Sequence, residues 1–123
     1  MEIFIDSSSR KEIQTWLEHG VVDGVTTNPS ILLKDGCRDL KAGALEICQI
    51  ANPLPVSVEV TSNNLDEMVR QGRQFAEWAG NVVVKIPIIN EHGDPALRVI
   101  KTLSNEGIKI NVTACLSYGQ AIL

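Results

Sequence analysis

One lysine, Lys85, lies in the middle of the apolar run VVVKIPI, which covers residues 82–88. Removing an ammonium group from water is costly unless the group is paired, and desolvation favours the neutral amine. The neutral amine is the form that attacks a carbonyl carbon to give a Schiff base. The iminium so formed draws electrons from the adjacent carbon, so a carbon–carbon bond next to a ketone can break or form without a metal or cofactor. We therefore predict that Lys85 is a nucleophile; a buried structural lysine with a partner is the alternative.

Two carboxylates, Asp6 and Glu59, are available to move the substrate's hydroxyl proton in such a reaction. Each stands at or near the end of a short apolar run, and alternate residues of a strand face opposite sides of a sheet. This alternation places Lys85 on a face that carries polar residues, whereas the other face of the runs is aliphatic. For a strand-end Asp, Asn or Thr, a turn residue or a helix cap is the alternative interpretation. We expect five side chains to converge on one rim: Asp6, Asn28, Glu59, Lys85 and Thr113.

The elements that must position these residues follow a regular alternation of short apolar runs and longer amphipathic stretches. This alternation indicates β-α units, and hence parallel strands with right-handed crossovers. No linker or low-complexity segment interrupts it, so residues 1–123 are expected to form one domain. The expected strands lie within residues 2–6, 21–27, 56–61, 81–88 and 108–116, with four helical stretches between them.

Two α/β architectures share this alternation, an open doubly wound sheet and a closed (β/α)₈ barrel. The length of 123 residues favours the open sheet, because a full barrel typically needs about 250 residues. The distribution of polar residues favours the barrel, since helices on both sides of an open sheet would make both of its faces apolar. We predict a (β/α)₈ TIM barrel, of which this chain holds about the first five β-strands and four helices.

Composition excludes several classes of function. The chain is 44% hydrophobic and 21% charged, as in an ordinary soluble globular protein. Its formal charge is −4 and its 11 basic residues are scattered, so the sequence shows no basic patch that would bind nucleic acid or a membrane surface. No export signal is visible. Cys37, Cys48 and Cys115 are odd in number and lack C-x-x-C spacing, which fits a reducing cytoplasm. His19 and His92 each stand beside glycine as isolated histidines, so we expect neither a metal nor a cofactor.

Five motifs, in order along the chain, are similar to those of the transaldolase family: FIDSS, DGVTTNPSIL, VSVEV, VVVKIPI and EGIKINVTACLS. The resemblance runs from Phe4 to the last residue, and several motifs in the right order make it specific. It implies a (β/α)₈ barrel and transfer of a dihydroxyacetone unit from a ketose phosphate to an aldose phosphate through a lysine Schiff base. The resemblance thus implies a sugar phosphate substrate and a place in the pentose phosphate pathway or related sugar phosphate metabolism.

The resemblance also implies roles for individual residues. Lys85 corresponds to the Schiff-base lysine and Asp6 to the carboxylate that transfers protons. Glu59 and Thr113 would hold the catalytic water.

Three further residues would bind substrate on the same resemblance. Asn28 and Asn111 correspond to residues that bind the hydroxyls of the intermediate. Thr26 lies on the same inward face as Asn28 and would line the site.

Within the family, fructose-6-phosphate aldolases usually carry glutamine at the position of Glu59 and lack the NVT motif, so the transaldolase branch is favoured. A fructose-6-phosphate aldolase-like enzyme is the alternative. The loop NEHGDPAL after the lysine differs from the shorter loop of many members, which leaves the choice of acceptor open.

The chain stops about one turn into the helix after the fifth strand. It is therefore either a fragment of a longer protein or a natural half-barrel, and the sequence leaves both alternatives open. The part of the family's pocket that grips phosphate would lie beyond it. Unpaired strand edges predict self-association into a homo-oligomer, and they also suggest a non-catalytic interaction module as an alternative. A small-molecule-binding open sheet is disfavoured, because no G-x-G-x-x-G loop follows any strand.

Overall fold

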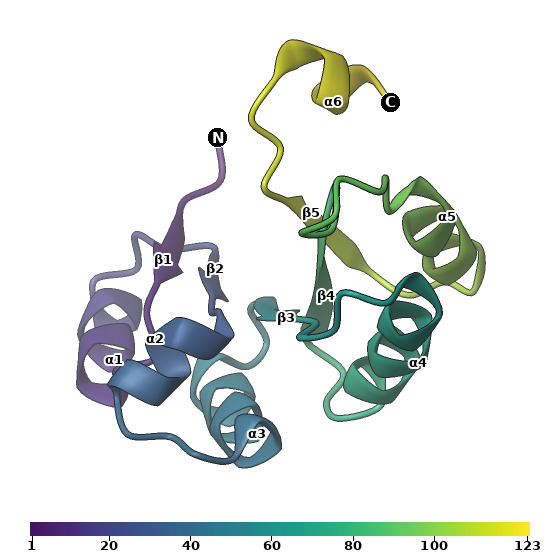
Figure 1. Cartoon of the computed structure of the whole chain (residues 1–123). Helices are drawn as coiled ribbons and strands as arrows, with labels where there is room; N and C mark the ends of the chain where they lie inside the picture. The colour runs from purple at the N-terminus through teal and green to yellow at the C-terminus, as the bar shows by residue number, and fades with distance from the viewer.

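Five parallel strands form one sheet in the order β1-β2-β3-β4-β5. In the computed structural model, which describes residues 1–123, the sheet curls into a half-barrel with its helices on the outside (Figure 1). The predicted first five strands of a (β/α) barrel are therefore confirmed. The strands are β1 (Phe4–Asp6), β2 (Gly24–Thr26), β3 (Val56–Glu59), β4 (Val82–Pro87) and β5 (Ile110–Thr113).

Two helices, not one, connect β2 to β3. Pro29 opens the first of them, where its missing N–H is no loss. The left-handed φ of +83° at Gly36 turns the chain away after that helix, and the Asp39 side chain caps the second by accepting the N–H of Ala42. The sequence had predicted a single helical stretch here. The helices are α1 (Arg10–Glu18), α2 (Pro29–Lys34), α3 (Leu40–Ala51), α4 (Leu65–Ala76), α5 (Leu97–Asn105) and α6 (Tyr118–Ile122).

The main core lies between the outer face of the sheet and the helices. Along β4, Val82, Val84 and Ile86 are buried, whereas the residues between them are only half-buried. Burial therefore alternates with a period of two, as a strand with one helix-covered face requires. None of the helices is long and apolar enough to cross a bilayer. The aliphatic face predicted from the sequence is the face that the helices cover.

The inner face of the half-barrel and its two outer strands are less well covered. β1 and β5 each pair on one side only. The Phe4 side chain is 38% exposed, and Val112 is 39% exposed. After β5 the chain continues into an arm that carries α6 away from the sheet (Figure 1), and on this arm Leu116 and Tyr118 are exposed.

Candidate active site

Lys85 stands on the inner side of β4, and its side chain is only 13% exposed. Its Nζ lies 3.5 Å from Glu59 Oε2 and donates to the backbone carbonyl of Thr27 at 3.4 Å. Glu59 is the register partner of Lys85 on β3, so backbone pairing places the two side chains next to each other. The largely buried amine thus has a charged partner, which compensates part of its desolvation and which the structural alternative for Lys85 also requires. The pair lies toward the carboxyl ends of β3 and β4, where (β/α) barrels carry their chemistry.

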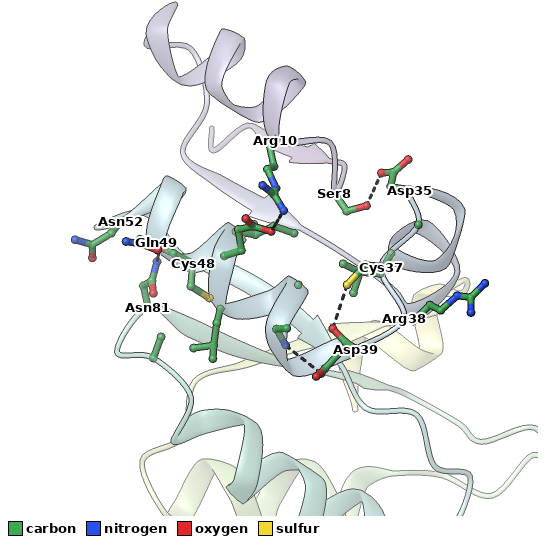
Figure 2. A pocket seen from close by; sticks show the side chains of 18 of the residues that line it. Ser8, Arg10, Asp35, Cys37, Arg38, Asp39, Cys48, Gln49, Asn52 and Asn81 are labelled. Carbon is green, nitrogen blue, oxygen red and sulfur yellow. Dashed lines mark hydrogen bonds and ion pairs between the residues drawn. The ribbon is translucent and has the colours of Figure 1, made fainter.

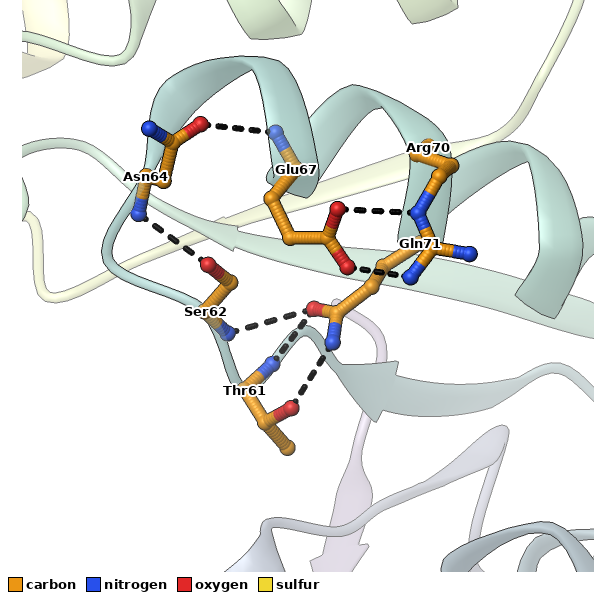
Figure 3. A network of polar contacts seen from close by, with 6 residues as sticks. All are labelled: Thr61, Ser62, Asn64, Glu67, Arg70 and Gln71. Atoms are coloured by element: carbon orange, nitrogen blue, oxygen red, sulfur yellow. Dashed lines mark hydrogen bonds and ion pairs between the residues drawn. The ribbon is translucent and has the colours of Figure 1, made fainter.

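The segment that follows Glu59 is fixed by a network from helix α4 (Figure 3). The Gln71 side chain accepts hydrogen bonds from the backbone N–H groups of Thr61 (3.0 Å) and Ser62 (3.2 Å). It also donates to the Thr61 hydroxyl at 2.9 Å. Asn64 then caps α4 by accepting the N–H of Glu67. These bonds hold the segment after β3 against helix α4.

Asp6 ends β1 and is held by the neighbouring strand. The Thr26 hydroxyl donates to Asp6 Oδ1 at 2.9 Å, and the two residues are register partners. This bond occupies one carboxylate oxygen and leaves the other available. The structure therefore brings together Asp6 and Thr26, both predicted from the sequence, as a second polar pair.

Asn28 has a structural role that the sequence left as an alternative. Its Oδ1 accepts the N–H of Ile31 at 2.9 Å and caps α2. Its amide nitrogen makes no hydrogen bond within the chain and remains available as a donor. A helix cap and a ligand contact are thus compatible at this residue, because they use different atoms.

Strand β5 supplies Asn111 and Thr113 at two different levels. Asn111 is the register partner of Lys85, and its Nδ2 donates to the hydroxyl of Ser57 at 3.1 Å. Thr113 pairs in register with Pro87, so it lies further along the rim than the lysine. Its hydroxyl makes no hydrogen bond within the chain.

Two residues around Lys85 were not predicted as site residues. Ser57 shares the inward parity of Glu59, and that parity was the signal for it. Thr27 contacts the lysine through a backbone carbonyl, for which no residue type gives a signal. No group of three or more His, Cys, Asp or Glu side chains is placed to hold a metal ion.

Comparison with known proteins decides the family. Residues 3–123 match the family model described as transaldolase/fructose-6-phosphate aldolase. The chain belongs to this family. It is 44% identical over 123 residues to a probable transaldolase of Dehalococcoides mccartyi, covering 100% of this chain and 55% of the relative. A probable transaldolase of Herpetosiphon aurantiacus is 47% identical over 123 residues, again over 100% of this chain and 53% of the relative. The chain thus spans about half the length of the curated relatives that it matches.

In this transaldolase-family chain, the loop after β4 is anchored to the loop after β3. Asn90 is buried, and its Nδ2 donates to the carbonyl of Asn63 and to Asp94 Oδ2, both at 3.1 Å. In return, the N–H of Glu91 donates to Asn63 Oδ1 at 3.2 Å. The loop that follows the Lys85 strand is therefore tied to the loop that follows the Glu59 strand.

A groove of about 1080 Å³ lies elsewhere, on the helical side of the half-barrel around α3 (Figure 2). Ser8, Arg10, Cys37 and Asp39 are among its lining residues, and none of the predicted site residues is. Two of its polar contacts are made within the chain: Arg10 pairs with Glu46, and the Ser8 hydroxyl donates to Asp35. We therefore place the candidate active site at the inner rim of this family member and not in the groove.

Proposed function

We propose that this chain carries the nucleophile of a transaldolase, which transfers a dihydroxyacetone unit from a ketose phosphate to an aldose phosphate in cytoplasmic sugar phosphate metabolism. The observation that carries the proposal is the largely buried Lys85 amine beside Glu59 at the rim, in a chain of this family. Asn111 supports it as the register partner of Lys85 on β5, and Asp6 and Thr26 form a hydrogen-bonded pair at the ends of β1 and β2.

In the proposed reaction, Lys85 Nζ attacks the ketone carbon and water leaves, which gives an iminium. Asp6 takes the proton from the hydroxyl next to the bond that breaks, and the aldehyde product departs. The electron pair of that bond moves into the iminium to form an enamine. The enamine attacks the aldehyde carbon of the acceptor, Asp6 returns the proton, and water releases the new ketose.

The remaining predicted residues have supporting roles in this proposal. Glu59, 3.5 Å from the amine, and Thr113 hold the water that hydrolyses the imine. The free amide nitrogen of Asn28 and the free Oδ1 of Asn111 bind substrate hydroxyls. Thr26 fixes the Asp6 carboxylate by its hydrogen bond of 2.9 Å. The proposed steps use no metal or cofactor.

Trapping with borohydride tests the proposal. The protein, as encoded in full by its gene, is incubated with fructose 6-phosphate and borohydride, and the adduct is mapped by mass spectrometry. We expect one adduct on Lys85, which the Lys85→Met variant loses completely. Lys109→Met is the matched control, because Lys109 shares the inward parity of β5 near its start but is exposed, and this variant should keep the adduct.

Asp6→Asn separates capture from turnover. This variant should still form adduct but turn over roughly 10²–10⁴-fold more slowly, because the loss of proton transfer does not prevent ketone capture. An adduct that persists in Lys85→Met, or that maps to Lys34, Lys41 or Lys101, contradicts the proposal.

A fructose-6-phosphate aldolase is the second candidate, since the family description covers both activities. The glutamate at position 59 favours the transaldolase. An aldolase would release free dihydroxyacetone from fructose 6-phosphate without an acceptor, whereas a transaldolase would retain it until an aldose phosphate is added.

A further inference from the structure

Ser57 lies on the inner side of β3 and is 1% exposed. Its hydroxyl accepts the hydrogen bond from Asn111 Nδ2 at 3.1 Å. β3 and β5 are not neighbours, because β4 lies between them. The bond therefore bridges over the strand that carries Lys85, and the curvature of the half-barrel makes this span possible (Figure 1).

The backbone carbonyl of Ser57 holds a second residue of the site, Thr27. It accepts both the N–H and the hydroxyl of Thr27, each at 3.0 Å. Thr27 is fully buried, so no water replaces these bonds. Its own carbonyl in turn accepts the Lys85 amine at 3.4 Å. Ser57 is thus linked to the lysine through Thr27 and to Asn111 directly.

These two links have different chemical consequences. With its amide nitrogen committed to Ser57, Asn111 keeps Oδ1 as an unpaired acceptor on the residue that is in register with Lys85, and such an acceptor suits a hydroxyl donor on the ketone. With its side chain and N–H committed to the Ser57 carbonyl, Thr27 keeps its carbonyl directed at the amine. The first link acts on substrate hydroxyls and the second on the nucleophile.

We propose that Ser57 is a positioning residue of the Schiff-base site, which orients Asn111 for an α-hydroxy ketone and supports the carbonyl that holds Lys85. This inference rests on the proposed function and adds a residue and a preference to it. Ketones that carry a hydroxyl next to the carbonyl are the ligand class for which Ser57 matters most.

The test compares adduct formation with dihydroxyacetone and with acetone, using borohydride trapping on the protein as encoded in full. Ser57→Ala should reduce the preference for dihydroxyacetone by about 3- to 10-fold, the range expected for one lost hydrogen bond. The double variant Ser57→Ala/Asn111→Ala should show the same preference as Asn111→Ala alone, because the serine hydroxyl acts through the asparagine.

Thr27→Val tests the second link without touching Asn111. This change keeps the volume of the side chain but removes the hydroxyl bond to the Ser57 carbonyl. It should slow adduct formation with both ketones by a similar factor and leave the preference unchanged. Asn81→Ala is the control for a purely structural effect, because Asn81 precedes β4 and donates to the carbonyls of Cys48 in α3 and of Leu54 before β3, away from the rim. It should lower the urea midpoint without changing the preference.

The outcomes separate the inference from the function on which it rests. No adduct on Lys85 of the unmodified protein overturns both. An adduct on Lys85 with an unchanged preference in Ser57→Ala, or with additive effects in the double variant, overturns the positioning role alone. If Ser57→Ala does not fold, Ser57→Cys keeps the connectivity of the side chain with a somewhat larger atom that is a weaker acceptor, and it must show a reduced preference for the proposal to stand.

Discussion

Replacement of Gly72 by alanine tests how tightly α4 packs against α5. Gly72 is a buried residue of α4, and a Cβ built on it would lie 2.5 Å from Cδ1 and 3.2 Å from Cδ2 of Leu103. Leu103 belongs to α5 and is 0% exposed, so its side chain cannot turn toward solvent. The added methyl group therefore has to displace Leu103 or separate the two helices.

Two terms of opposite sign set the size of the effect. Alanine is better than glycine in a helix interior by roughly 1 kcal/mol. Extra volume in a packed core typically costs about 1–3 kcal/mol. Because the Cδ1 contact must lengthen from 2.5 Å to at least 3.4 Å to become ordinary, we use the upper part of this range. We expect Gly72→Ala to lower the free energy of unfolding by about 1–2 kcal/mol, measured by urea denaturation followed by circular dichroism.

Gly80→Ala is the matched control, because Gly80 is exposed and a Cβ there meets nothing within 4 Å. It should be neutral or stabilising by up to about 1 kcal/mol. Leu103→Ala should restore space in the Gly72→Ala background, so the cost of the double variant should be less than the sum of the single costs. A Gly72→Ala protein as stable as Gly80→Ala would refute the reasoning, since it would show that α4 and α5 yield without cost.

Two further predictions concern a thiol and the open sheet. Burial raises the pKa of the Cys48 thiol from 9.0 to about 11, so the folded protein should lose stability as the pH rises from 9 to 11, where only the unfolded thiol readily ionises. The urea midpoint should fall less across this range in Cys48→Ala than in the unmodified protein, and an equal fall in both would contradict the assignment. The isolated chain of 123 residues should self-associate through its edge strands, β1 and β5, and through exposed apolar residues such as Phe4. A monodisperse monomer in light scattering would be evidence against this.

The sequence by itself determined the strands, their parallel order and the face on which the lysine lies. Successive side chains of a strand face opposite sides, so the pattern around Lys85 separates the residues buried under helices from the residues on the inner face. The same pattern placed Asp6 and Glu59 on the inner face. The start of α2 is equally local, because Asn28 and Pro29 carry the cap and the first turn in adjacent residues.

Only the tertiary structure decided which polar groups meet. Register between strands makes Glu59 and Asn111 the partners of Lys85 and moves Thr113 to the level of Pro87. The hydrophobic pattern excludes a slip of one residue, but the choice among registers two residues apart arises from pairing between segments distant in the chain. The bond between Ser57 and Asn111 also requires the sheet to curl, since another strand separates them. The contact of Thr27 with the lysine uses a carbonyl that every residue possesses, so only the folded backbone could place it there.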